Sequence, residues 1–364
     1  MSAARLTVRA IRARAVEVPM RHVLGTSQAA VRAAPLLLVD LDTEEGVTGR
    51  AYLFCYLPAS APGIAAILAE IERVTKGERV APLDACRKLA RRFTLVGVQG
   101  IVRMAMSAFD VACWDALAVA AGQPLCALLG ATPGPVPAYN SNGLGLMDPG
   151  PLADEAEELL EGGFEAVKLR LGYPTLAGDL AAVRAVRDRV GPSVAIMVDY
   201  NQALTVAEAL ARGRALDAEG LAWIEEPIRH DDYAGAARLV RDLATPVQIG
   251  ENFSLPQGMA QALEAGACDL VMPDLERIGG VTGWQRAAAL AGARGIEMSS
   301  HLFPEVSAHL LRATPTAHWL EYVDWAAPIL AEPLRVEDGR AIPSERPGCG
   351  LAWNEEAVER YRVA

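Results

Sequence analysis

Three acidic residues stand where short apolar segments end in the middle of the sequence. Asp199 closes SVAIMVD, Glu225 closes LAWIE, and Glu251 follows PVQIG. Three carboxylates that converge without a cation repel one another and raise one another's pKa. A hard divalent cation relieves this repulsion, and three oxygen ligands with water completing an octahedron suit Mg²⁺. The trio therefore predicts a magnesium site, although each residue taken singly could equally be a helix N-cap or a partner in a rim ion pair.

Asp274 and His301 close the next two apolar segments, CDLVMPD and IEMSSH. A carboxylate that accepts a proton from one imidazole nitrogen fixes the tautomer and makes the other nitrogen a better base. A histidine at a strand end is more often structural, but His301 lies beyond the acidic trio and next to an aspartate-bearing segment. His309 and His318 lack that setting. The pattern therefore predicts His301 as a general base that Asp274 orients.

Glu321 and Asn201 are weaker candidates for the same site. Glu321 closes HWLE; an ionised carboxylate there would repel a bound carboxylate, so a catalytic role requires a protonated acid with a raised pKa that donates a hydrogen bond. An ordinary rim carboxylate is the alternative. Asn201 lies two residues beyond Asp199, and the two-residue period of a strand places both on one face, where Asn201 could contact substrate.

Lys168 and Arg170 lie two apart in AVKLR, an apolar segment typical of a buried strand. On a strand they project to the same face. Two buried cations side by side are costly unless negative charge lies opposite. We therefore expect both to face an anion.

The elements that position these residues alternate between helical and apolar segments over residues 136–330. DLAAVRAVRDRVG followed by SVAIMVDY is one example of six or more such βα units. This alternation predicts an α/β fold with a parallel sheet, and the spacing matches the ~31 residues per unit of a TIM-type barrel, whose chemistry lies at the carboxyl ends of the strands. An open doubly wound sheet is the alternative, but no G-x-G-x-x-G or P-loop motif favours it.

Residues 1–135 follow a different pattern, that of an α+β domain. The stretch PLLLVDLDTEEGVTGRAYLF predicts a hairpin that turns at residues 43–46. Helical patterns follow from about residue 61 and from Gly100 to Ala121, where Gly122 and Pro124 are typical helix-ending residues.

Composition limits the class of partner. The chain has 52% hydrophobic and 22% charged residues, a net charge of −11 and a pI of about 5.1, which argues against nucleic acid or an anionic membrane as a partner. The six cysteines are scattered without a C-x-x-C pair, as in a reducing compartment. No secretory signal and no apolar run of ~18 residues is recognised. We therefore expect a cytoplasmic protein without a membrane partner.

Taken in order, these motifs resemble the mandelate racemase branch of the enolase superfamily. The similarity rests on KLR at 168–170, DYNQ at 199–202, EEP at 225–227, GEN at 250–252 and SSHL at 299–302, and IGGVTGW and APLLLVDL extend it over nearly the whole chain. The resemblance implies a modified barrel over residues 136–330 beneath a capping domain, residues 1–135, which residues from about 331 to 364 rejoin. It also implies a homo-oligomer, often an octamer.

The resemblance further implies a reaction and a set of roles. The shared chemistry removes the proton next to a carboxylate and stabilises the resulting enediolate with Mg²⁺ and hydrogen-bond donors. The implied roles are magnesium ligands (Asp199, Glu225, Glu251), the base with its partner (His301, Asp274), a cation near the metal-bound carboxylate (Lys168), an acid supporting the enolate (Glu321) and contacts to substrate oxygens (Asn201, Ser141).

Arg170 departs from the racemase pattern, which has a lysine that acts as a second base at that position. Arginine keeps its proton up to a pKa above ~12, so it accepts a proton poorly. Whole-chain similarity places a mandelate racemase-like racemase or epimerase of a 2-hydroxycarboxylate first. An acid-sugar dehydratase, a hydro-lyase with His301 and Asp274 as its single base, comes close behind. A Schiff-base aldolase on Lys168 and a barrel that only binds ligand are the remaining alternatives.

Overall fold

An antiparallel three-stranded sheet forms the N-terminal part of the chain in the computed structural model, which describes residues 5–27 and 29–363. Its strands, in spatial order, are β1 (Val8–Gly25), β2 (Ala30–Thr43) and β3 (Thr48–Phe54). The predicted hairpin between β2 and β3 is confirmed, with Thr43 N donating to Val47 O at 2.9 Å and Gly46 at a φ of 82°. The helical elements that follow are η1 (Pro58–Ser60), α1 (Ala61–Thr75), α2 (Pro82–Arg92), α3 (Gly100–Ala121) and α4 (Leu125–Leu128).

Helix α3 corrects one expectation from the sequence. By length and composition it is apolar enough to cross a membrane, with a mean hydropathy of 1.4 over its best window, so the expectation that no such run exists is wrong. Arg103, Asp110 and Asp115 interrupt the run in sequence, yet all three are buried. Within the protein 72% of that window is buried, as in the core helix of a globular protein. The helix ends where predicted, with Gly122 in the left-handed conformation.

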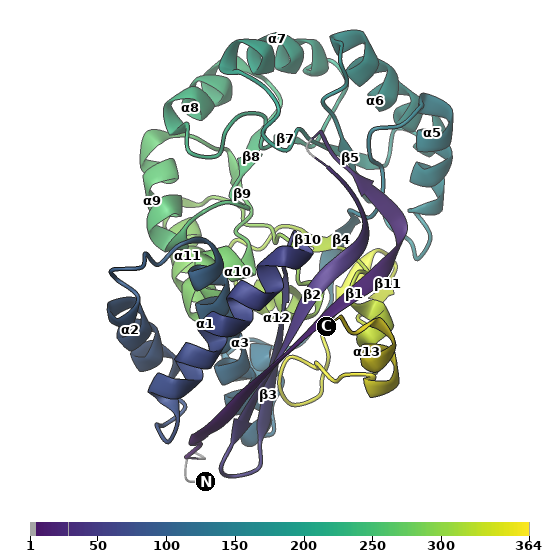
Figure 1. The fold of residues 1–364 in the computed structure, drawn as a ribbon. Coiled ribbons are helices and arrows are strands. Elements are labelled where there is room, and N and C mark those ends of the chain that lie inside the picture. Colours follow the sequence, from purple (N-terminus) through teal and green to yellow (C-terminus); the bar gives the residue numbers. More distant parts are fainter. Residues whose placement is uncertain (1–4, 28, 364) are drawn as a thin grey trace.

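The middle of the chain forms a closed parallel barrel, which confirms the predicted fold class (Figure 1). Its strands are β4 (Val136–Asn140), β5 (Ala166–Arg170), β6 (Ala195–Asp199), β7 (Trp223–Glu225), β8 (Val247–Ile249), β9 (Leu270–Val271) and β10 (Leu320–Tyr322). Strand β10 pairs in parallel with β4, and bridges from Val271 to Met298 and from Met298 to Ala317 complete the ring. An open doubly wound sheet has free edges, so this closure excludes it.

Helices surround the barrel, as the alternating pattern predicts (Figure 1). They are α5 (Pro149–Glu158), α6 (Leu176–Val190), α7 (Val206–Leu216), α8 (Tyr233–Asp242), α9 (Leu255–Ala265), α10 (Leu275–Ile278), α11 (Gly280–Arg294) and α12 (Pro304–Arg312). Local sequence sets several ends: Thr205 and Glu208 form a capping box at the start of α7, and Gly266 and Gly295 end α9 and α11 in the left-handed conformation.

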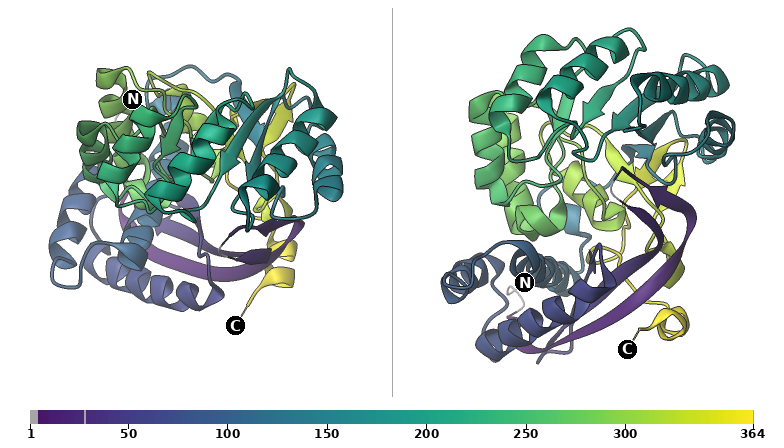
Figure 2. Two further views of the ribbon diagram at one scale, coloured as in Figure 1. Left: turned by 90° about the horizontal axis from the view of Figure 1, so that it is seen from above. Right: turned by 45° about the horizontal axis from the view of Figure 1, so that its top comes forward.

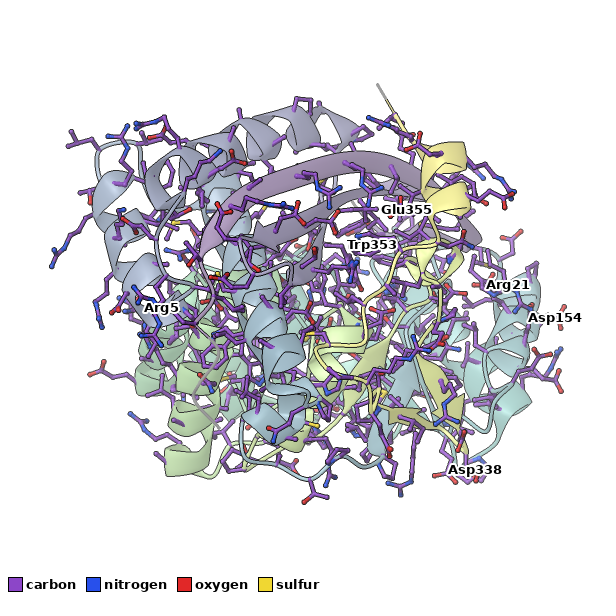
Figure 3. All side chains as sticks on the ribbon, turned by 90° about the horizontal axis from the view of Figure 1, so that it is seen from below. Arg5, Arg21, Asp154, Asp338, Trp353 and Glu355 are labelled. Atoms are coloured by element: carbon purple, nitrogen blue, oxygen red, sulfur yellow. The ribbon has the colours of Figure 1, made fainter. Side chains whose placement is uncertain are left out.

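The C-terminal segment contacts both the barrel and the N-terminal sheet. Its elements are η2 (Ala327–Ile329), β11 (Arg335–Glu337), β12 (Arg340–Ile342) and α13 (Glu355–Tyr361). Strand β12 pairs with β11 and, antiparallel, with β4 of the barrel, whereas the residues around α13 lie against the N-terminal sheet. Trp353 Nε1 donates to Asp40 Oδ1 at 2.7 Å, and Glu355 pairs with Arg14; Figure 3 shows Trp353 and Glu355 beside these strands. The boundaries at residues 135 and 330 stay predictions.

The N-terminal domain lies on one side of the barrel, over loops that follow its strands (Figure 2). Ser27 Oγ donates to Tyr200 O at 3.2 Å, after β6, and the main-chain N–H of Phe54 donates to Glu276 Oε2 at 3.2 Å, in α10. Tyr52 in β3 donates its hydroxyl to Glu305 in α12 at 2.5 Å. These contacts place the ends of β1 and β3 over the barrel rim.

Candidate active site

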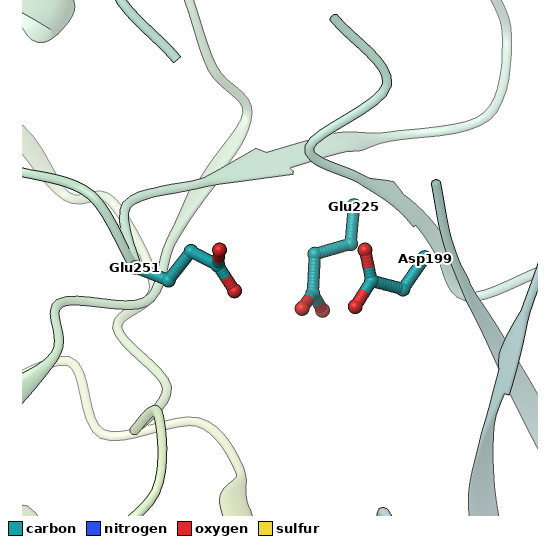
Figure 4. Close-up of side chains that lie close together, drawn as sticks. All are labelled: Asp199, Glu225 and Glu251. Carbon is teal, nitrogen blue, oxygen red and sulfur yellow. The ribbon is translucent and has the colours of Figure 1, made fainter. Parts of the chain in front are cut away.

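Asp199, Glu225 and Glu251 lie together at the carboxyl ends of β6, β7 and β8. One oxygen from each lies within 4.8 Å of the other two, and Figure 4 shows their side chains approaching a common space. Asp199 and Glu225 are cross-strand neighbours in register. Gly250, between β8 and Glu251, has a φ of 142°. A Cβ on Gly250 would lie 2.9 Å from Met272 N, so a larger residue would not fit here without a shift. The sequence predicted this convergence.

Burial disfavours the charged forms of Asp199 and Glu225. His301 and Arg277, by contrast, outweigh burial at Glu251 and lower its pKa. Burial raises the pKa of Glu225 to about 8, against the opposing effect of Lys168, and burial also raises the pKa of Asp199. Asn201 donates its Nδ2 to Asp199 at 2.9 Å, while its buried Oδ1 has no hydrogen-bond partner in the described part of the chain. A donor set made of three convergent carboxylates fits a hard divalent cation such as Mg²⁺.

Lys168 is a buried cation among three acidic strand ends. Its Nζ lies 2.5 Å from Glu225 Oε1, 2.7 Å from Glu321 Oε1 and 3.6 Å from Asp199 Oδ2. Burial lowers the pKa of Lys168, but these carboxylates outweigh burial and raise it above its ordinary value. A Schiff-base aldolase needs a neutral amine. The aldolase hypothesis therefore loses its physical basis.

Asp274 and His301 form the expected pair. His301 Nδ1 lies 2.6 Å from Asp274 Oδ2, while His301 Nε2 lies 3.1 Å from Glu251 Oε2. The other oxygen of Asp274 accepts hydrogen bonds from Glu276 N and Arg277 N, so Asp274 is also the N-cap of α10. Burial lowers the pKa of His301, but the surrounding carboxylates outweigh it and raise that pKa well above its ordinary value. The carboxylates thus stabilise the imidazolium that forms once His301 has taken up a proton.

Glu321 differs from the expectation of a protonated acid. Its Oε1 accepts from Ser141 Oγ at 2.7 Å and faces Lys168, while its Oε2 accepts from the main-chain N–H of Leu302 at 2.8 Å. Burial raises the pKa of Glu321, but Lys168 and His301 outweigh burial and lower it. The expected raised pKa is wrong, because donors and cations surround this carboxylate and favour its charged form.

Arg170 also differs from expectation, because its hydrogen-bond partners are main-chain carbonyls and one hydroxyl rather than an anion. Its Nη1 donates to Ser141 O at 2.7 Å and to Gly143 O at 3.0 Å, and its Nη2 donates to Ser141 Oγ at 3.0 Å. Arg170 therefore holds the loop after β4. The Ser141 hydroxyl bridges Arg170 and Glu321, so the expected contact of Ser141 with substrate stays a prediction that this arrangement does not favour.

Two sizeable cavities of the protein do not coincide with this cluster. A shallow space of about 860 Å³ is bordered by Val98, His230 and Gln261, and one of about 640 Å³ by Leu334 and Cys349. Neither gathers the carboxylates, the lysine or the histidine described above. The chemistry of the side chains, rather than cavity size, identifies the site.

Comparison with known proteins identifies the family of this chain. Residues 9–130 match the family model for the mandelate racemase / muconate lactonizing enzyme N-terminal domain, and residues 151–357 match the enolase C-terminal domain-like family. The chain belongs to the enolase superfamily, in its mandelate racemase / muconate lactonizing enzyme branch. The resemblance inferred from the motifs is therefore confirmed, and the protein is an enzyme.

The names of proteins similar to this enolase-superfamily enzyme mention different small molecules. An L-talarate/galactarate dehydratase from Salmonella typhimurium is 33% identical over 347 residues, which cover 94% of this chain and 86% of the relative. An enolase from alpha proteobacterium bal199, solved with bound Mg, is 49% identical over 98% of this chain and 100% of its own, with a TM-score of 0.97. A Bradyrhizobium enolase solved with magnesium and mandelic acid is 42% identical over 100% of both chains, with a TM-score of 0.94.

Sequence reasoning missed three side chains of the superfamily enzyme's site. Strand alternation would turn Glu226 away from Glu225, but β7 ends at Glu225 and Glu226 has a φ of 38°, so this alternation does not apply. Its Oε1 accepts from Gly250 N at 2.9 Å. No sequence pattern pointed to Glu276. A pattern did point to Trp223, because two-residue spacing on a strand places it on the same face as Glu225.

Proposed function

We propose that this enzyme removes the α-proton of a 2-hydroxycarboxylate and then eliminates a β-hydroxyl group, as an acid-sugar dehydratase does. The observation that carries this proposal is the single base. His301 is paired with Asp274, whereas Arg170 is held by main-chain carbonyls and cannot readily accept a proton. The named dehydratase among the relatives supports the same choice. The sequence ranked the racemase first; the site and this relative favour the dehydratase.

Asp199, Glu225 and Glu251 would hold Mg²⁺, which would supply positive charge to the substrate carboxylate and to the charge that develops on it. Lys168 adds a fixed ammonium on the same side, since its partners include Glu225 and Asp199. Its charge is worth most where negative charge grows in the transition state.

The proton follows a path through one imidazole. His301 Nε2 takes the proton from the α-carbon, while Nδ1–H stays hydrogen-bonded to Asp274 and keeps the tautomer fixed. The electron pair left by the C–H bond forms a carbon–carbon double bond as the β-carbon–oxygen bond breaks. The imidazolium then gives its proton to the departing hydroxide, which leaves as water, and the enol product converts to a 2-keto acid.

Screening acid sugars and 2-hydroxy acids with Mg²⁺ tests this function, with formation of a 2-keto-3-deoxy acid as the readout. We expect a keto acid from at least one β-hydroxylated substrate, and no keto acid from His301→Asn, because general-base catalysis contributes about 10²–10⁴-fold. Absence of any keto acid across the screen would contradict the dehydratase proposal.

A mandelate-type racemase is the second candidate, favoured by the neighbour solved with mandelic acid. Deuterium exchange at the α-carbon of each mandelate enantiomer in D₂O separates the two. One base predicts exchange of a single enantiomer. Equal and fast exchange of both enantiomers would show that a second base acts and would establish the racemase instead.

A further inference from the structure

Trp223 lies two residues before Glu225 on the same strand. It begins β7, is 1% exposed, and packs in a small core cluster with Tyr139, Ala166 and Met197 that is separate from the main core. Its ring meets that of Tyr139 edge-on, with centroids 5.4 Å apart and an interplanar angle of 79°. These contacts hold the indole in one orientation.

The indole is bonded to one of the three convergent carboxylates. Trp223 Nε1 donates to Glu225 Oε2 at 3.1 Å, while the other oxygen of Glu225 lies 2.5 Å from Lys168 Nζ. Two donors on opposite oxygens fix the rotation of the carboxyl group. An ionised carboxylate has about four lone-pair sites, so both oxygens retain lone pairs for a metal ion.

We propose that Trp223 is a positioning residue for Mg²⁺, which orients Glu225 as a ligand through its indole N–H. This inference rests on the proposed magnesium site. An indole suits this task because it only donates, so it cannot compete for the cation, and because its ring is rigid. Hydrogen bonds to a metal ligand from groups behind it set the ligand's orientation, and their loss typically weakens metal affinity about 10–100-fold.

The alternative is that the indole merely satisfies its N–H in a buried place, as buried tryptophans usually do. Trp284 provides the matched control for that case. It is also 1% exposed, and its Nε1 donates to Thr314 Oγ1 at 3.0 Å. Replacing Trp284 removes an equally buried indole hydrogen bond that involves no carboxylate of the site.

The test measures Mg²⁺ affinity by titration calorimetry for the wild type, Trp223→Phe and Trp284→Phe, with circular dichroism to confirm folding. We expect Trp223→Phe to bind Mg²⁺ about 10–100-fold more weakly and Trp284→Phe to match the wild type. We also expect Mg²⁺ to change the tryptophan fluorescence of the wild type and of Trp284→Phe, and this change to shrink in Trp223→Phe.

Each outcome has a distinct meaning. Wild-type affinity in a folded Trp223→Phe would overturn the positioning role, as would an equal loss in both variants. If Trp223→Phe does not fold, Trp223→Tyr keeps a ring against Tyr139 without the indole N–H and takes its place. If the wild type binds no Mg²⁺, the proposed function fails independently of Trp223.

Discussion

At the scale of single residues, the buried carboxylates of the site surround one buried lysine, Lys168. Lys168 contacts Glu225 and Glu321 within hydrogen-bond distance, and His301 lies 3.9 Å from Glu321 on the other side. Neighbouring groups, rather than residue type, set each ionisation state here. The lowered pKa of Glu321 and the raised pKa of His301 follow from the same contacts.

Lys168→Met tests the role of this cation. We expect turnover to fall on the order of 10²–10³-fold, because a donor aimed at the developing negative charge is lost. Lys76→Met, at an exposed position after α1, should leave turnover unchanged. Steady-state kinetics and melting temperatures of both variants provide the measurement, and unchanged turnover in a folded Lys168→Met would contradict the assigned role.

Borohydride trapping addresses the aldolase alternative at the same residue. Since the carboxylates raise the pKa of Lys168, it stays an ammonium and should form no imine with a carbonyl compound. Peptide mass spectrometry after reduction is expected to find Lys168 unmodified. A substrate-derived adduct on Lys168 would bring the aldolase hypothesis back.

At the scale of elements, the short helix α10 connects His301 to the N-terminal domain. It begins at Asp274, which bonds His301, and two residues later Glu276 accepts a hydrogen bond from the main chain of Phe54 at the end of β3. Burial and Asp274 raise the pKa of Glu276, and Glu276 Oε1 has no hydrogen-bond partner in the described part of the chain. These hydrogen bonds connect the end of β3 to the pair of Asp274 and His301.

Glu276→Leu is expected to loosen this junction. The Phe54 amide would lose its acceptor, and a buried unpaired N–H costs about 1–3 kcal/mol. Hydrogen–deuterium exchange of a peptide spanning β3 should be faster in Glu276→Leu and near wild type in Glu276→Gln, whose amide oxygen still accepts. Glu305→Leu, which removes a different buried acceptor for β3 without touching this amide, should not change exchange at Phe54. Equal exchange in Glu276→Leu and wild type would show that this bond carries little weight.

At the scale of the whole molecule, buried titratable groups link stability to pH. Burial lowers the pKa of His309 in α12 to about 4, from its ordinary value near 6.5. Between pH 6.5 and about 4, His309 binds a proton in the unfolded chain but not in the folded chain. Stability is thus fully present above pH 6.5 and is lost as pH falls towards 4, by on the order of 3 kcal/mol.

Replacing His309 with Gln should flatten this acid-side loss. Urea unfolding at pH 7 and pH 4.5 measures the difference in the free energy of unfolding for the variant and the wild type. His230→Gln, at an exposed position, should keep the wild-type slope. A slope in His309→Gln equal to the wild type would mean that other groups produce the acid sensitivity.

Magnesium should stabilise the whole fold, because it binds the folded chain and not the unfolded one. An excess of about 100 times the dissociation constant corresponds to about 2.7 kcal/mol. We expect the melting temperature to rise with Mg²⁺, to fall again with a chelator, and to be insensitive to Mg²⁺ in Asp199→Asn. A melting temperature of the wild type that does not respond to Mg²⁺ would contradict the metal site. The predicted homo-oligomer can be checked in the same samples by light scattering.

The sequence by itself determined the features that depend on local pattern. The hairpin turn at Gly46 and the end of α3 at Gly122 follow from residue types that favour these backbone conformations. The convergence of Asp199, Glu225 and Glu251 follows from the regular spacing of the βα units, because the carboxyl ends of parallel strands meet on one rim of a barrel. The family resemblance rested on this order and is confirmed.

Tertiary structure alone decided the charge states and the partners of the same residues. The pKa of Glu321 is lowered because Lys168, far away in sequence, lies 2.7 Å from it, and Arg170 donates to carbonyls of the loop after β4. The pairing of Trp223 with Glu225 likewise needs the closed barrel. A pKa and a hydrogen bond depend on distances through space and on burial, and a linear pattern specifies neither.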